Sequence, residues 1–119
     1  MKKVLVVEDD PFIRDITTIK LSEHPYEVLS APDGETALSL MVSFKPDFLL
    51  LDLNLPDISG VEVLIAQKAN PELRNIKTIV FSNNDNDEMR KKVIDLGIAG
   101  FFVKVSTDYN DLYALIDSL

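Results

Sequence analysis

The sequence predicts a single α/β domain in which a parallel sheet is covered by helices on both faces. Short apolar runs recur along the 119 residues, and segments with the 3.6-residue period of a helix separate them. The runs do not alternate with polar residues, which is typical of parallel strands buried on both faces. Strands and helices that alternate five times imply right-handed crossovers and a doubly wound α/β sandwich.

Five segments are predicted to be strands. Four are apolar runs rich in β-branched or aromatic residues, and Tyr26–Ala31 is a weaker candidate. The run Phe48–Leu51 is far too short to span a bilayer. The three other strong runs are Val4–Val7, Thr78–Phe81 and Phe101–Val103.

A segment with helical period follows each predicted strand. In the first, Pro11 suits the first helical turn, and Phe12, Ile13, Ile16 and Ile19 have the spacing of an apolar helix face. The later helices have predicted N-caps at Asp33 and Ser59, Gly97 just beyond a C-terminus, and Asp108 near the start of the last. Their apolar positions are Ala37, Leu38, Met41, Val42, Val61, Leu64, Ile65, Met89, Val93, Leu96, Leu112, Leu115, Ile116 and Leu119.

The composition excludes several classes of function. The net charge of −8 argues against direct binding to nucleic acid or to an anionic membrane surface. The chain has no cysteine, which excludes disulfides, thiolate metal sites and cysteine nucleophiles. The first apolar run is stopped by three acids, so it is no export signal, and the reducing cytoplasm is the expected compartment.

Polar side chains follow four of the predicted strands. Glu8 and Asp9 follow the first, Asp52 the third, Ser82 the fourth and Lys104 the fifth. The carboxyl ends of parallel strands lie at one edge of a sheet, where open α/β folds bind their ligands. Each residue alone suits a cap or a solvated loop, but together they predict a functional site.

This predicted site favours Mg²⁺ and a phosphoryl group. Its ligands are hard carboxylate oxygens, with no cysteine and one remote histidine, His24, so zinc and copper are disfavoured. Lys104 adds a positive charge and Ser82 a hydroxyl donor for a phosphoryl oxygen. Asp52 is then placed to attack phosphorus and form an acyl phosphate.

At this point the sequence resembles the receiver domain of two-component response regulators, of the kind represented by chemotaxis regulators. The resemblance covers essentially residues 1–119 as a single receiver domain, with no output domain expected in this chain, and implies a flavodoxin-like sheet with strand order 2-1-3-4-5. It rests on the segments Val4–Asp10, Ala31–Glu35, Lys45–Asp47, Leu50–Asp57 with Ser59 and Gly60, then Ser82, and finally Gly100–Lys104.

The resemblance implies roles for these residues. Asp52 would be the phosphoacceptor of a phosphorelay, charged by a phosphohistidine on a sensor histidine kinase or a histidine phosphotransfer protein. Ser82 and Lys104 would contact the phosphoryl oxygens. Such a module is no conventional enzyme, because it catalyses only its own phosphorylation and dephosphorylation.

The family also implies a metal and a switch. Mg²⁺ would be held by Asp9, by Glu8 through water, by Asp52 and by the backbone carbonyl of Asn54. Ser82 would move toward the phosphoryl group while Phe101, which otherwise suits plain core packing, turns inward. The face formed by the fourth helix, fifth strand and fifth helix would then bind a downstream protein, or a second copy in a phosphorylation-linked homodimer.

Two positions depart from the family pattern. Val105 replaces the usual proline after the lysine, so we expect either a trans Lys104–Val105 bond with a displaced loop or a strained cis bond. Asn83 stands where a small residue is usual and is expected to hinder movement over the phosphoryl group. The alternative function is therefore a degenerate receiver that binds partners without phosphorylation.

Two further classes of function agree less well with the sequence. A flavin or nucleotide binder would need glycine in the turn after the first strand, so that backbone N–H groups could bind phosphate. This chain has three acids there. Metal-dependent phosphatases with an aspartyl nucleophile usually carry Asp-x-Asp after their first strand. Here Asp52-Leu53-Asn54 follows the third strand and lacks the second acid for acid–base chemistry. Tyr109 and Tyr113 are candidates for a partner-binding surface.

Overall fold

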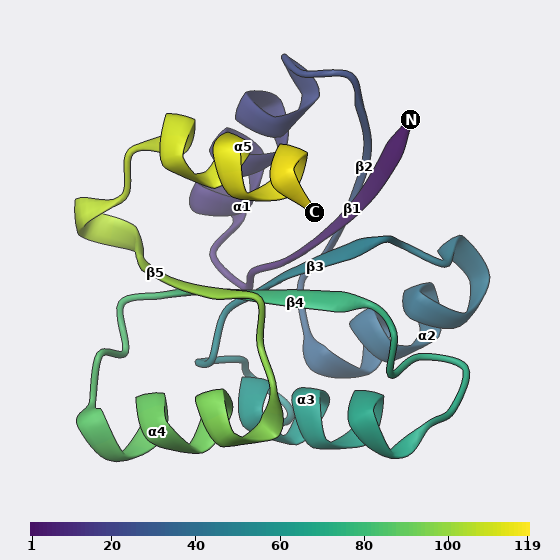
Figure 1. Ribbon diagram of the computed structural model, residues 1–119, viewed down its shortest axis with the longest axis vertical. Coiled ribbons are helices and arrows are strands. Elements are labelled where there is room, and N and C mark those ends of the chain that lie inside the picture. Colours follow the sequence, from purple (N-terminus) through teal and green to yellow (C-terminus); the bar gives the residue numbers. More distant parts are fainter.

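The computed structural model describes residues 1–119 and contains a five-stranded parallel sheet in the order β2-β1-β3-β4-β5 (Figure 1). This confirms the predicted doubly wound, flavodoxin-like α/β class. The strands are β1 (Lys2–Val7), β2 (Tyr26–Ala31), β3 (Phe48–Leu51), β4 (Lys77–Ser82) and β5 (Gly100–Val103). The helices are α1 (Pro11–Ser22), α2 (Gly34–Phe44), α3 (Gly60–Ala69), α4 (Asp87–Leu96) and α5 (Tyr109–Ser118), with a 3₁₀ turn, η1 (Lys104–Ser106), between β5 and α5.

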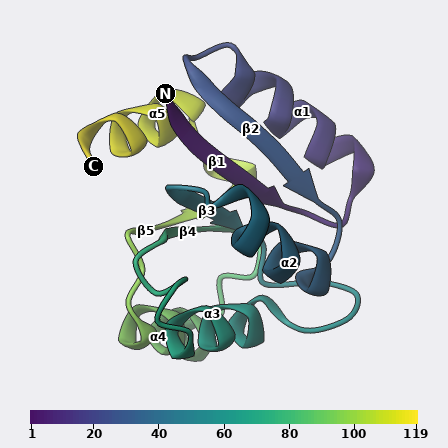
Figure 2. The same cartoon turned by 90° about the vertical axis from the view of Figure 1, so that its right-hand side faces the viewer.

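Helices cover both faces of the sheet. Helices α1 and α5 lie on one side, and α2, α3 and α4 lie on the other (Figures 1 and 2). Val4 and Val6 of β1 belong to the core beneath α1 and α5, whereas Leu5 and Val7 belong to the core on the opposite face. All four side chains are buried, which explains why this strand is apolar at every position.

The strand registers gather the carboxyl ends of the strands at one edge. Val7, the last residue of β1, pairs with Leu51, the last of β3, so the residues that follow them, Glu8 and Asp52, are neighbours. Ser82, the last residue of β4, pairs with the last residue of β5. The chemistry-bearing residues of four strands therefore lie side by side at the same edge.

Polar side chains cap the helices as the sequence predicts. Asp33, Ser59 and Asp108 each accept a hydrogen bond from a backbone N–H of the first turn of α2, α3 and α5. Gly97 follows α4 with a φ of 95°, a conformation that favours glycine. Asp10, the third acid after β1, is the N-cap of α1 ahead of Pro11. Its carboxylate accepts hydrogen bonds from the first turn of the helix.

Helix α1 packs through a different face from the one predicted. Phe12 and Ile19 are 73% and 61% exposed, and the buried residues of α1 are Thr17 and Leu21. A buried threonine is tolerated here because its hydroxyl hydrogen-bonds the hydroxyl of Tyr109, with 3.1 Å between the oxygens. The helix face that was predicted to be buried from its apolar spacing is therefore largely exposed to solvent.

The two tyrosines of α5 are also placed differently from the prediction. Tyr113 is buried, and its hydroxyl donates to the Lys20 carbonyl at 2.7 Å. Tyr109 is half-buried and bonds Thr17. They attach α5 to α1 instead of forming a partner surface. Half-buried His24 lies against the Tyr113 ring, with 3.7 Å between the centroids and an angle of 35° between the ring planes.

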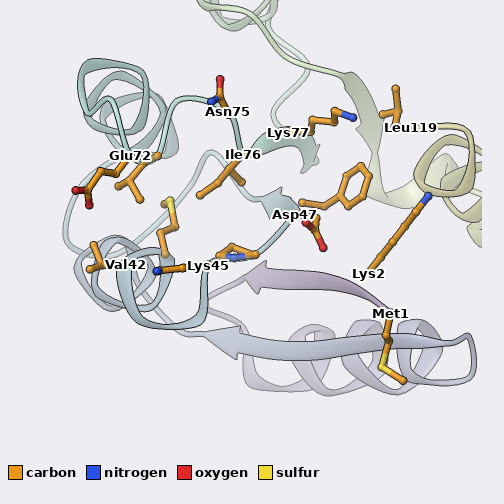
Figure 3. Close-up of a pocket in the computed structure, with 14 residues that line it drawn as sticks. Met1, Lys2, Val42, Lys45, Asp47, Glu72, Asn75, Ile76, Lys77 and Leu119 are labelled. Carbon is orange, nitrogen blue, oxygen red and sulfur yellow. The ribbon is translucent and has the colours of Figure 1, made fainter.

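A groove of 790 Å³ lies at the opposite end of the sheet from the polar strand ends (Figure 3). Its lysines have structural contacts: Lys2 donates to the Ile116 carbonyl near the end of α5 at 2.6 Å, and the ammonium of Lys77 lies 5.8 Å from the centre of the Phe48 ring. The groove is thus separate from the site predicted by the sequence.

No helix combines the length and the apolar character needed to cross a membrane.

Candidate functional site

The structure brings four of the predicted site residues into one hydrogen-bonded cluster. Glu8 follows β1, Asp52 follows β3, Ser82 ends β4 and Lys104 begins η1 after β5. Glu8, Asp52 and Ser82 are buried, and Lys104 is half-buried. Four strand ends therefore supply one compact polar site.

The carboxylate of Asp52 is at the centre of this cluster and is 5% exposed. Its Oδ1 accepts hydrogen bonds from the Ser82 hydroxyl at 2.9 Å and from the Asn54 backbone N–H at 3.2 Å. Its Oδ2 accepts from the Lys104 ammonium at 2.9 Å. Donors on both oxygens orient the carboxylate.

Glu8 is the second buried carboxylate, and Lys104 joins it to Asp52. The Lys104 ammonium pairs with Glu8 Oε1, and Glu8 Oε2 accepts from the Asp10 backbone N–H at 3.2 Å. Burial raises the pKa of Glu8; the hydrogen bond from Lys104 opposes this rise, and the charge of Asp52 adds to it. Burial would lower the pKa of Lys104, but its hydrogen bonds to Glu8 and Asp52 outweigh that effect and raise it.

Asp9 completes a group of three carboxylates. Asp9 is exposed, and one oxygen each from Glu8, Asp9 and Asp52 all lie within 4.8 Å of one another. This is a set of hard oxygen donors at one edge of the sheet, and its chemistry fits Mg²⁺ better than a softer metal. Asn54 lies two residues beyond Asp52 and is exposed.

Phe101 lies outside the hydrogen-bonded cluster. It is in β5, is half-buried against the core beneath α2, α3 and α4, and the Arg90 guanidinium of α4 sits 4.3 Å from its ring centre. That distance is within the range of a cation–π contact. The predicted switch residue is therefore in contact with α4 rather than with Asp52.

The segment after Lys104 resolves the alternatives expected for Val105. The structure has no cis peptide bond, so the Lys104–Val105 bond is trans, and the segment turns into η1. The Lys104 ammonium nevertheless reaches both Glu8 and Asp52. The Val105 N–H donates to Oδ1 of Asn83 at 3.0 Å, so the two unusual positions contact each other.

Three residues make contacts around the site that were not predicted from the sequence. Arg14 donates to the carbonyls of Glu8 and Asp9, at 3.0 and 3.3 Å, and so holds the acidic turn to α1. Asn84 donates its backbone N–H to Ser82 Oγ at 3.1 Å. Asp57 accepts from two N–H groups at the start of α2. An arginine one turn into the helix after an acidic loop was the one available signal. The contacts of Asp57 join distant segments, and the contact of Asn84 is a local turn between residues two positions apart.

The fold and this arrangement define a receiver-type α/β domain, and comparison with known proteins assigns the family. Residues 4–117 match the response regulator receiver domain family, and the chain belongs to it. This membership favours the receiver interpretation over the flavin-binding and phosphatase alternatives. Receiver domains are signalling modules of two-component systems rather than conventional enzymes.

Individual relatives agree with this assignment. The chain is 32% identical over 117 residues to the response regulator PleD of Caulobacter vibrioides, covering 98% of this chain and 26% of PleD. It is 32% identical over 104 residues to the CAI-1 autoinducer sensor kinase/phosphatase CqsS of Vibrio cholerae, covering 87% of this chain and 15% of CqsS. The chain thus spans only a fraction of the length of these relatives.

Solved structures show the same fold. The chemotaxis protein CheY4 of Vibrio cholerae has a TM-score of 0.89 with 25% identity, over 99% of this chain and 98% of that one. A CheY-like receiver domain protein from Methanospirillum hungatei has a TM-score of 0.88 with 28% identity, over 99% and 92%. Both likenesses extend along essentially the whole chain.

Proposed function

We propose that this domain is the phosphoacceptor of a two-component phosphorelay and that Asp52 receives a phosphoryl group from a phosphohistidine. The observation that carries the proposal is the environment of Asp52. Its buried carboxylate is held by Ser82 on one oxygen and by Lys104 on the other, beside two further acids. A structural aspartate would not need a buried hydroxyl, an ammonium and an acidic neighbour at once.

The proposed reaction is a displacement at phosphorus. An oxygen of Asp52 attacks, the bond between phosphorus and the donor imidazole nitrogen breaks, and the imidazole leaves with the bonding electrons and takes up a proton. Catalysis of this kind rests on positioning and on charge stabilisation more than on proton transfer. Lys104 and Ser82 already donate to the attacking carboxylate, so a small movement would bring both to the new phosphoryl oxygens.

Mg²⁺ is the cofactor that this donor set supports. Glu8, Asp9, Asp52 and the backbone carbonyl of Asn54 would hold it, with water completing its coordination. When bound, the ion would offset the negative charge of the carboxylates and of the incoming phosphoryl group. Lys104 pairs with two of the same carboxylates, so its ammonium must yield part of its contact with Glu8.

The proposed output is a change on the face formed by α4, β5 and α5. Ser82 would move toward the phosphoryl group, and Phe101 would turn inward behind it. The half-buried ring of Phe101 and its contact with Arg90 support this proposal, because movement of the ring would reach α4 directly. Ile94 of α4 is 54% exposed and would contribute apolar contact area. The partner would be a downstream protein or, in a homodimer, a second copy.

The donor would be a sensor histidine kinase or a histidine phosphotransfer protein. The similarity to a region of the sensor kinase/phosphatase CqsS supports a kinase partner. The cytoplasm is the proposed compartment, since the chain holds no cysteine that would gain from an oxidising one.

The decisive experiment is phosphorylation by acetyl phosphate with Mg²⁺, followed by mass spectrometry of the intact protein. We expect one phosphoryl group on the wild type and none on Asp52→Asn. Asp95→Asn, which removes an exposed acid on α4, is the matched control and is expected to be phosphorylated normally. If the wild type gains no phosphoryl group and does not bind beryllofluoride, the domain is instead a phosphorylation-independent interaction module.

A further inference from the structure

Three consecutive residues at the end of β4, Ser82 and the two that follow it, contact three different parts of the site edge. Ser82 donates to Asp52, and Asn84 donates its side-chain N–H to Oδ1 of Asn54 at 3.4 Å. Between them, Asn83 turns its side chain toward η1 and accepts the N–H of Val105 at 3.0 Å. The loop between β4 and α4 is therefore bonded to the loops after both β3 and β5.

The contact with Val105 depends on its backbone and not on its side chain. The Val105 residue is 83% exposed, so its side chain adds little packing. Its N–H is available only because the residue is not proline, which has no backbone donor. Asn83 is exposed as well, so no core packing requires an asparagine there.

These contacts close a ring around Asp52. Asn83 follows Ser82 in the chain and Val105 follows Lys104. Ser82 donates a hydrogen bond to Oδ1 of Asp52, and Lys104 donates one to Oδ2. The hydrogen bond from the Val105 N–H to Asn83 links the two residues that follow them and so closes the ring. A lysine side chain has several rotatable bonds, so fixing the backbone beside it narrows the positions that its ammonium can adopt.

We propose that Asn83 is a positioning residue that holds the Lys104 ammonium at Asp52 by accepting the N–H of Val105. The bond makes the loops after β4 and β5 move as a unit, so that Ser82 and Lys104 reach the phosphoryl oxygens together. This inference rests on the proposed phosphoacceptor function for its effect on rate, but the contact itself is independent of that function.

The test compares variants that remove either partner of the bond with variants that keep it. Asn83→Ala removes the acceptor, and Val105→Pro removes the donor. Val105→Ala keeps the N–H and is the matched control, and Asn83→Asp keeps an acceptor oxygen at the same position. Three quantities are measured: the phosphorylation rate with acetyl phosphate, the Kd for Mg²⁺, and the exchange rate of the Val105 amide hydrogen.

We expect Asn83→Ala to lower the phosphorylation rate by about three- to tenfold, the effect of one hydrogen bond of ordinary strength. Val105→Pro should lower the rate as well, and the double variant should be no slower than the slower single one. The Kd for Mg²⁺ should stay equal or become tighter in Asn83→Ala, because a less firmly held ammonium competes less for Glu8. The Val105 amide should exchange faster in Asn83→Ala and remain protected in Asn83→Asp.

Contrary outcomes are distinct from failure of the proposed function. A phosphorylated wild type with an unchanged rate in Asn83→Ala overturns the positioning role, as does weaker Mg²⁺ binding, which would indicate general disruption of the site. If the wild type is not phosphorylated at all, the proposed function fails, and the amide exchange and the Mg²⁺ affinity still decide whether Asn83 holds the loop and the ammonium.

Discussion

Lys104 serves two acids at once, which makes it the residue on which the electrostatics of the site depend. Its ammonium pairs with Glu8 and Asp52, whose side chains are 4% and 6% exposed. Buried carboxylates this close repel each other strongly unless a positive charge lies between them. The lysine is thus required both for the proposed chemistry and for the stability of the folded site.

Lys104→Met tests that double requirement. Without Mg²⁺ the variant leaves two buried like charges without a positively charged partner, and we expect it to lose up to about 3–5 kcal/mol of unfolding free energy. Mg²⁺ should restore more stability to the variant than it adds to the wild type, because no ammonium competes with the ion. Urea unfolding with and without Mg²⁺ measures both. Lys91→Met, at an exposed lysine on α4, is the control, and an equally stable Lys104→Met would contradict the argument.

At the scale of elements, α1 shows how tertiary contacts select a helix face. Several of its apolar side chains face solvent: Ile19 is 61% exposed and Ile16 is 37% exposed. Leu21 is fully buried, whereas Phe12 is largely exposed. Thr17 lies on the side of α1 that faces α5, where its hydroxyl forms a hydrogen bond with the hydroxyl of Tyr109.

The two faces of α1 should differ sharply in their contribution to stability. Leu21→Ala leaves a cavity in the core and is expected to cost about 2–5 kcal/mol. Phe12→Ser removes a mostly hydrated ring and should change the unfolding free energy by less than about 0.5 kcal/mol. Urea denaturation of the two variants decides between this packing and the one predicted from the periodicity, in which Phe12→Ser would be the costly change.

The start of α2 depends on an acid from a distant loop. Asp57, in the loop after β3, accepts the N–H groups of Gly34 and Glu35, each at 2.9 Å. The hydrogen bond from Gly34 is the main cause that lowers the pKa of Asp57. A carboxylate at a helix N-terminus is also favoured by the helix dipole.

Asp57→Asn should therefore destabilise the domain in a pH-dependent way. Because folding lowers the pKa of Asp57, its stabilising contribution is present above the unfolded value of 3.8 and is lost as pH falls through the lower folded value. The wild type should exceed the variant in stability at neutral pH, and the difference should shrink below that unfolded value. Thermal unfolding across this range tests the sign, and a difference that grows on acidification would refute it.

For the whole molecule, the net charge of −8 divides into two populations of acids. Many of the acids are exposed on helices and loops, and some, such as Asp10 and Asp33, cap helix starts. Glu8, Asp9 and Asp52 instead converge within 4.8 Å. Bringing them together costs free energy on folding, so a cation that binds only the folded arrangement should stabilise the entire domain.

Mg²⁺ should accordingly raise the Tm of the wild type. At 100 times its Kd, a ligand specific for the folded state adds about 2.7 kcal/mol to the unfolding free energy. Asp9→Asn should lose most of this gain, whereas Asp95→Asn, at an exposed acid of α4, should keep it. The measurement is a thermal melt at constant ionic strength, and an equal Mg²⁺ effect in both variants would place the ion elsewhere.

Much of the fold could be predicted without coordinates. Unbroken apolar runs such as Val4–Val7 indicate buried parallel strands, and Asp33 and Ser59 mark helix starts, because these signals arise from local chain geometry and from burial on both faces. The convergence of Asp52, Ser82 and Lys104 was also predictable, since it requires only that parallel strands end at one edge.

The remaining features depend on how elements pack against one another, which no local pattern encodes. The face that α1 buries follows from its partner α5, through Thr17 and Tyr109, and not from its own periodicity. The hydrogen bond from Val105 to Asn83 joins two residues that are 22 positions apart in the sequence. These are the two residues that depart from the family pattern, and they contact each other. Local sequence thus determines which elements form and where their ends meet, whereas contacts between distant loops determine how the site is held, because such contacts exist only once the chain has folded.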